Sequence, residues 1–220
     1  MVRVTIFDLR QETHVFVNGL PVSWFATRDW ANVGRSQTEI EEEEAVWVQS
    51  LGPGSEIAVR PGHPVKKGNA ESAVPRQVIV KEASIERDLV SSAGAGYVRL
   101  AVTDHTRPLD EAVDRFIVAV RSLSKNAWAH FHCEAGLGRT TTFMVLYDML
   151  RNSTRVSLED IVRRQKLLGY DVLRPLEHDN WKAPYAEDRS AFVRAFYNYG
   201  CANPNRRPQL WSEWLRSGER

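Results

Sequence analysis

The 220-residue sequence has only two cysteines, Cys133 and Cys201, and almost no excess of charge of either sign. Two cysteines cannot form a disulfide framework. The 29 Lys and Arg residues nearly balance the 28 Asp and Glu residues, which argues against binding nucleic acid or a membrane through bulk charge. Apolar runs also stay well short of the roughly 18 residues that suggest a membrane span. Any anion-binding site must therefore be made locally.

The beginning of the sequence does not have the pattern of a secretion signal. Residues 1–9 predict a strand rather than a charged and then apolar leader. A processed form of an exported protein would have the same appearance. The compartment is therefore left open between the cytoplasm and export.

The length and composition predict one well-buried domain. With 43% hydrophobic residues, the chain can bury a sizeable core, and we predict that residues 1–220 form a single domain. Residues 52–76 are the least regular segment, with four prolines and four glycines. This segment predicts a loop or a much reduced β annex.

Strand and helix patterns alternate through the middle of the chain. Strands are predicted at 97–102 and 128–132, and helices at 108–123 and 138–151. This alternation predicts an α/β fold in which a mainly parallel central sheet is flanked by helices. Near the start, Asn18-Gly19 within residues 15–24 is a strong signal for a β-hairpin.

A further helix is predicted to open at Ser36, because Glu39 three residues later completes a capping box. It includes four consecutive glutamates, Glu41 to Glu44. Consecutive helical residues point in different directions, so the run does not form a metal cluster. We interpret it as a solvated acidic face.

The strongest chemical signal surrounds Cys133, which comes directly after the predicted strand ending at His132. The next helix begins about five residues later, so successive backbone N–H groups can form an anion-binding nest. Gly136 and Gly138 permit the backbone angles that such a loop needs. Arg139, six residues after Cys133, can grip two oxygens of a phosphoryl group.

The same loop favours the reactive form of the thiol. Only the thiolate is a good nucleophile, and a helix N-terminus, the nest and Arg139 all favour the anion. Thr140 can add a hydroxyl hydrogen bond to the sulfur, and His132 is expected to brace the loop. Cys201 has no comparable setting and is predicted to have no chemical role.

Asp104 follows the predicted strand 97–102 and precedes Pro108, where the next helix is expected to open. The C-terminal ends of parallel strands gather at one edge of a sheet, so Asp104 and Cys133 should share a crevice. A phosphate ester needs an acid to protonate its leaving oxygen, and Asp104 is the best candidate. Because an aspartate at a strand end is more often a turn or cap residue, the residues alone leave both interpretations open.

The motif beginning His132-Cys133 resembles the Cys-x5-Arg signature of the protein tyrosine phosphatase superfamily. Its finer form is similar to bacterial cysteine phytases, which dephosphorylate myo-inositol polyphosphates. The motif reads His132-Cys133-Glu134-Ala135-Gly136-Leu137-Gly138-Arg139-Thr140. The resemblance covers nearly the whole chain through the stretches 8–14, 29–32, 103–105, 114–116, 128–132 and 180–182, and residues 52–76 match least well.

The resemblance implies roles for several residues outside the motif. Asp104 falls in the family's general-acid loop. Lys182 and Arg189 resemble positions that hold substrate phosphates distant from the reacting one. Lys66 and Lys67 lie where the family supplies substrate-binding basic residues, although ordinary solvated lysines are the alternative.

Three further assignments concern the immediate surroundings of the thiol. Residues 134–138 would contact the phosphoryl group through their backbone. The side chain of Glu134 is expected to point away, because a carboxylate turned inward would repel the substrate. His105 either faces the substrate or caps its loop.

Together these features predict a phosphatase that hydrolyses myo-inositol polyphosphates through a phosphocysteine on Cys133. The mechanism requires no metal or other cofactor. The expected partner is the small-molecule substrate, not nucleic acid or a membrane, and the chain is expected to be a monomer or weak homodimer. Alternatives are a protein tyrosine, dual-specificity or phosphoinositide phosphatase with the same chemistry, or an inactive phosphate-binding module.

Overall fold

The computed structural model describes residues 3–24, 26–62, 74–204 and 209–218. The chain divides into two compact units, one made of residues 1–10 and 96–220 and the other of residues 11–95. Within the described ranges, no helix is long and apolar enough to cross a membrane.

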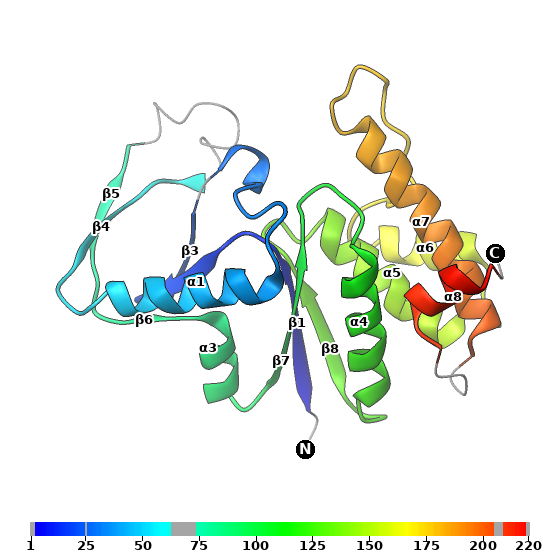
Figure 1. The fold of residues 1–220 in the computed structure, drawn as a ribbon, viewed down its shortest axis with the longest axis horizontal. Coiled ribbons are helices and arrows are strands. Elements are labelled where there is room, and N and C mark those ends of the chain that lie inside the picture. Colours follow the sequence, from blue (N-terminus) through cyan, green and yellow to red (C-terminus); the bar gives the residue numbers. More distant parts are fainter. Residues whose placement is uncertain (1–2, 25, 63–73, 205–208, 219–220) are drawn as a thin grey trace. The chain divides into compact units, whose positions relative to one another are not determined.

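The first unit is built on a three-stranded sheet with the order β7-β1-β8. Its strands are β1 (Val4–Arg10), β7 (Gly96–Val102) and β8 (Trp128–His132). Both neighbours run parallel to β1, and Asp8 lies opposite Arg99 on one side and His132 on the other. The prediction of a parallel sheet flanked by helices is therefore confirmed (Figure 1).

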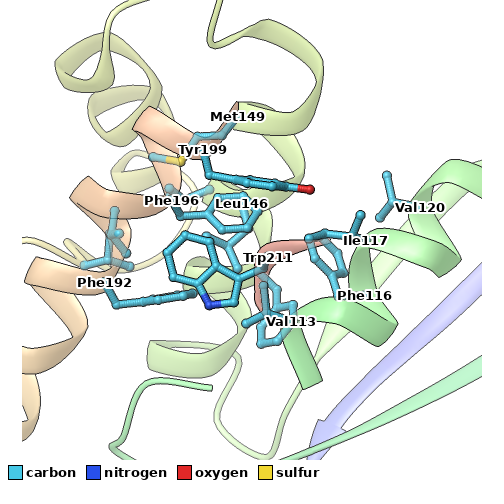
Figure 2. Packing of buried hydrophobic residues seen from close by; sticks show 14 of the residues in the cluster. Val113, Phe116, Ile117, Val120, Leu146, Met149, Phe192, Phe196, Tyr199 and Trp211 are labelled. Carbon is cyan, nitrogen blue, oxygen red and sulfur yellow. The ribbon is translucent and has the colours of Figure 1, made fainter. Parts of the chain in front are cut away.

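The described residues of this unit form five helices: α4 (Asp110–Ser122), α5 (Gly138–Asn152), α6 (Leu158–Lys166), α7 (Ala183–Ala202) and α8 (Trp211–Ser217). The helix α4 buries Val113, Phe116 and Ile117 along one face, which is the spacing of an amphipathic helix. Figure 2 shows this face beside Phe196 and Trp211. The core thus joins the flanking helices to the sheet.

Edge-to-face contacts between aromatic rings help to set how the helices pack in the core. The rings of Phe116 and Phe143 meet edge to face, with centroids 5.0 Å apart. Trp211 meets Tyr199 in the same way at 5.8 Å, and its indole N–H donates a 2.9 Å hydrogen bond to Asp110. Such contacts add roughly 0.5–1.5 kcal/mol each to the burial of the rings. They fix α8 against the start of α4.

A buried carboxylate, Asp148 on α5, is bound from α6. It accepts hydrogen bonds from Arg164 and Gln165, and from Asn152 one turn along its own helix. Burial alone would raise the pKa of the Asp148 carboxyl, but the hydrogen bonds, led by Arg164, lower it below its ordinary value. The charged form of Asp148 is therefore a link between the two helices.

We expect Asp148→Asn to lower the free energy of unfolding by about 1–2 kcal/mol at neutral pH. A carboxyl whose pKa is lowered on folding stabilises the fold above its unfolded pKa, and that stabilisation is lost as the pH falls. The difference from wild type should therefore shrink below the ordinary value of 3.8. Urea unfolding at neutral pH and at about pH 3 measures it.

The exposed pair of Asp160 and Arg163 on α6 provides a matched control, because it has the same chemistry without burial. Asp160→Asn should change the free energy of unfolding by no more than about 0.5 kcal/mol. Equal losses in the two variants at neutral pH would contradict the role given to Asp148.

The second unit contains two small antiparallel sheets. The first has the order β3-β2-β6 and the second pairs β4 with β5. Their strands are β2 (His14–Val17), β3 (Leu20–Ser23), β6 (Ala83–Ser84), β4 (Glu56–Val59) and β5 (Arg76–Ile79). Among the described residues, this unit also has η1 (Thr27–Asp29), α1 (Gln37–Ser50) and α3 (Glu86–Ser92).

The predicted hairpin is present, with β2 and β3 joined through Asn18 and Gly19 at φ values of 53° and 75°. Both angles belong to the tight turn that Asn-Gly favours. The Asn18 side chain also donates to the Ile79 carbonyl and accepts from the Lys81 N–H, at 2.8 and 2.7 Å. The turn therefore connects the first sheet to the end of β5.

The predicted capping box at the start of α1 is also present, with Ser36 and Glu39 satisfying each other's backbone N–H groups. The interpretation of Glu41 to Glu44 as a solvated face is wrong at Glu44, which is buried. Its carboxylate accepts the backbone N–H of His14 at 2.9 Å, while the His14 ring bonds Glu86 at 2.9 Å. A buried carboxylate with a partner replaces the expected exposed one.

The division of the chain into two compact units is relevant to the prediction that residues 1–220 form a single domain. The segment that was predicted to supply at most a reduced annex, residues 52–76, contributes β4 and the first residue of β5 to a unit that spans residues 11–95. Whether the 220 residues fold as a single domain stays a prediction. Lys66 and Lys67 lie outside the described residues.

Candidate active site

Cys133 lies between the end of β8 and the start of α5, and its side chain is buried. The Thr140 hydroxyl is 3.2 Å from the sulfur and can donate a hydrogen bond to it. Gly136 has a φ of 69°, a left-handed conformation that glycine adopts without strain. Residues 134–137 are exposed to solvent, whereas Cys133 is buried.

Arg139 connects this loop to the end of β7, the strand on the far side of β1 in the sheet. It is 3% exposed, and its guanidinium donates a 3.2 Å hydrogen bond to the Val102 carbonyl. Its Nε lies 3.1 Å from Oδ1 of Asp104, in the loop that follows β7. The structure thus brings Asp104 and the Cys133 loop together.

Asp104 and His105 form a short irregular turn between β7 and α4. His105 Nε2 lies 3.0 Å from Asp104 Oδ2, so one carboxylate oxygen faces His105 and the other faces Arg139. The backbone of His105 has a φ of 70°, which is uncommon for a residue with a side chain. Its ring meets the edge of Trp181 at 5.1 Å. Both ring and backbone of His105 are therefore engaged at this turn.

The two predicted phosphate-binding residues near α7 differ in their surroundings. Lys182 is partly exposed at the N-terminal boundary of α7, with Nζ 5.2 Å from the centre of the Trp181 ring. Arg189 is buried one and a half turns into the helix, and it donates a 3.2 Å hydrogen bond to the His105 carbonyl. Burial lowers the pKa of Arg189, and Tyr170 and Asp104 partly oppose that effect. Lys182 is thus accessible, whereas Arg189 lies inside the unit.

His132 precedes the thiol on β8, and its neighbour on β1 is the fully buried Asp8. Asp8 accepts hydrogen bonds from the Tyr97 hydroxyl at 2.7 Å and the Arg10 N–H at 3.0 Å. The sequence analysis did not single out Asp8 or Tyr97. A carboxylate between the apolar residues Phe7 and Leu9 was the available signal, since a buried charge needs partners.

A second feature that the sequence analysis missed supports the start of α5. The Thr141 hydroxyl accepts the Tyr170 N–H at 3.0 Å. A Cβ on Gly169 would lie 2.3 Å from that hydroxyl, so only glycine allows the chain to pass this close. The segment after α6 is thereby held against the helix that carries Arg139.

A parallel sheet with a cysteine loop between strand and helix defines the phosphatases of the tyrosine-phosphatase-like fold. Residues 57–151 match the family model of the PTP-like phytases. The description of that family is "inositol hexakisphosphate". The solved PTP-like phytase of Bdellovibrio bacteriovorus is 42% identical with a TM-score of 0.82, over 98% of this chain and 77% of that one. The chain belongs to the PTP-like phytase family.

Other relatives are considerably longer than this chain. The tandemly repeated PTP-like phytase of Mitsuokella multacida is 37% identical with a TM-score of 0.88, over 97% of this chain and 36% of that one. The PTP-like myo-inositol phosphatase of the same organism has been solved with myo-inositol-(1,3,4,5)-tetrakisphosphate. The effector protein hopD2 of Pseudomonas syringae pv. tomato is 36% identical, over 96% of this chain and 46% of its own length.

Proposed function

We propose that the chain removes phosphate from myo-inositol polyphosphates through a covalent phosphocysteine on Cys133. The observation that carries the proposal is the 3.2 Å approach of the Thr140 hydroxyl to the Cys133 sulfur, at the start of a helix. A hydroxyl donor and a helix N-terminus both favour the thiolate over the thiol. The backbone N–H groups at this helix N-terminus are also suited to bind a phosphate oxyanion.

In the first step, the Cys133 thiolate attacks phosphorus, so that the S–P bond forms as the bond from phosphorus to the ester oxygen breaks. Arg139 and the loop N–H groups would stabilise the charge on the three non-bridging oxygens. Arg139 is suited to this because its planar guanidinium can bind two oxygens at once. Its burial against Val102 fixes its direction.

Asp104 would supply the proton that the leaving oxygen needs and so act as the general acid. Its 3.1 Å distance from Arg139 supports this role, because it places the carboxyl beside the group that would bind phosphate. In the second step, water attacks the phosphocysteine, and Asp104 accepts a proton from that water. Phosphate leaves and the thiolate is restored, so the steps need no cofactor.

The substrate class is supported by the family and by one relative. The Mitsuokella multacida phosphatase binds an inositol tetrakisphosphate, and 97% of this chain is similar to 36% of that one. A polyphosphate requires cations beyond Arg139, and Lys182 is a candidate because it is partly exposed and lies over Trp181, whose ring contacts His105. Lys66 and Lys67 stay candidates from the sequence alone.

Phosphate release from inositol hexakisphosphate, a phosphotyrosine peptide and a phosphoinositide vesicle tests the substrate class. We expect kcat/KM to be at least about 10-fold higher for inositol hexakisphosphate, because the peptide and the lipid carry fewer phosphates for the additional cations to bind. Cys133→Ser serves as the blank in each assay. Faster hydrolysis of the peptide or of the vesicle lipid would overturn the substrate class and leave the chemistry standing.

A further inference from the structure

Arg189 lies where three segments of the first unit meet. It is carried by α7, is 6% exposed, and donates a 3.2 Å hydrogen bond to the backbone carbonyl of His105. Its Nη1 is 3.8 Å from the position that a Cβ on Gly138 would occupy. Its guanidinium carbon is 5.7 Å from the centre of the Tyr170 ring. One cation thus binds the Asp104 loop and lies close to Gly138, at the end of the Cys133 loop.

Burial of this cation has an energetic consequence. Burial lowers the pKa of Arg189, and the carboxylate of Asp104 is among the groups that oppose this by favouring the charged form. A guanidinium taken out of water needs fixed acceptors in return. The His105 carbonyl is such an acceptor, so displacing it is costly.

The acceptor belongs to a strained turn. His105 has a φ of 70°, a left-handed conformation that is unfavourable for a residue with a side chain. Such a conformation persists only where its surroundings hold it. The hydrogen bond from Arg189 fastens the carbonyl of this residue, immediately after Asp104.

The second arginine that contacts this turn is Arg139, and its contact would be disturbed during the reaction. Its Nε lies 3.1 Å from Asp104, but a bound phosphoryl group would compete for the same guanidinium. The bond from Arg189 goes to a backbone carbonyl and does not depend on that competition. It can therefore hold the turn at the stage when Asp104 has to meet the leaving oxygen.

We propose that Arg189 is a positioning residue, which holds the turn of Asp104 and His105 against the Cys133 loop while Arg139 binds phosphate. The proposal rests on the general-acid role of Asp104 in the proposed function. It replaces the role that the family resemblance implied for Arg189, as a contact to a distant substrate phosphate. That role fits Lys182 better, because Lys182 is the more exposed of the two.

The test compares Arg189→Gln with wild type on phenyl phosphate and p-nitrophenyl phosphate. Phenol is the poorer leaving group and depends more on a proton donor. Displacing Asp104 should therefore lower kcat for phenyl phosphate by roughly 10- to 100-fold, with a smaller fall for p-nitrophenyl phosphate. KM for both esters should stay nearly unchanged, since neither has a distant phosphate.

Two comparisons separate positioning from a general loss of structure. Arg189→Lys keeps a donor and should recover part of the lost kcat for phenyl phosphate. Arg194→Gln changes an exposed arginine on the same helix and should leave both esters unaffected. In the Asp104→Asn background, Arg189→Gln should cost little more, because both changes remove the same step.

Equal falls in kcat for both esters, or full additivity with Asp104→Asn, would overturn the positioning role. Slow hydrolysis of inositol hexakisphosphate by wild type would refute only the substrate class, since the aryl esters still report on the leaving-group step. If wild type hydrolyses no ester, amide hydrogen exchange at Asp104, His105 and Thr106 decides. Unchanged exchange in Arg189→Gln would then refute the inference, whereas faster exchange confined to this turn would support it.

Discussion

Replacing Cys133 by serine is expected to lower kcat for every phosphate ester by about 10⁴-fold or more, because a serine hydroxyl is not ionised at neutral pH. The loop that favours a thiolate does not provide a base able to activate a hydroxyl. Thr140 donates to the sulfur and so favours an anion that serine does not form. Initial rates of phosphate release over a range of enzyme concentrations measure the loss.

Cys201→Ser is the matched control. Cys201 is exposed, and its thiol donates a 3.4 Å hydrogen bond to the Ser153 carbonyl that a serine can reproduce. Its kcat should equal that of wild type within about 2-fold, in line with a surface substitution. Acid quenching during turnover should trap a phosphoenzyme in wild type and in Cys201→Ser only. A phosphoenzyme or near-normal rate in Cys133→Ser would refute the cysteine mechanism.

The second large effect is expected for Asp104→Asn, with kcat on an inositol phosphate lowered roughly 100- to 1,000-fold. Asparagine has nearly the same size but does not donate a carboxyl proton to the leaving oxygen. The loss should be much smaller for p-nitrophenyl phosphate, whose leaving group needs less assistance. The decline of kcat at high pH that a general acid produces should also disappear.

Asp188→Asn is the control for this substitution. Asp188 is on α7 and lies 3.5 Å from Arg107, which is in the same segment between β7 and α4 as Asp104, but the Asp188 side chain is 60% exposed. An exposed ion pair contributes little, so kcat should change by less than about 2-fold. If Asp188→Asn and Asp104→Asn cost the same, the effect would come from the charge of the segment rather than from proton transfer.

Local patterns allowed much of the fold to be predicted. Asn18-Gly19 and the Ser36 capping box act within a few residues, so the hairpin and the start of α1 are encoded where they occur. The parallel sheet also follows from an alternation that requires crossover helices. Asp104 approaches Arg139 for a related reason, because they follow the C-terminal ends of β7 and β8, and parallel strands end at the same edge of the sheet.

The partners of buried charges could not be predicted in this way. Glu44 is one of four similar glutamates, and only its distant neighbour His14 distinguishes it. Arg189 lies in a helix, and the sequence of that helix does not indicate that the arginine donates a hydrogen bond to the backbone carbonyl of His105. Such choices depend on which segments meet in three dimensions, and the cost of an unpaired buried charge enforces them only after the chain has folded.

The central strand β1 has a consequence for folding during synthesis. Its partners β7 and β8 begin at residues 96 and 128, and the whole second unit lies between β1 and β7 in the chain. The sheet therefore cannot close until β8 has left the ribosome, whereas residues 11–95 can pair among themselves earlier. Such long-range parallel pairing is slow. Until β8 emerges, the edge of β1 that pairs with β8 stays open to other chains, even if β7 already occupies the other edge.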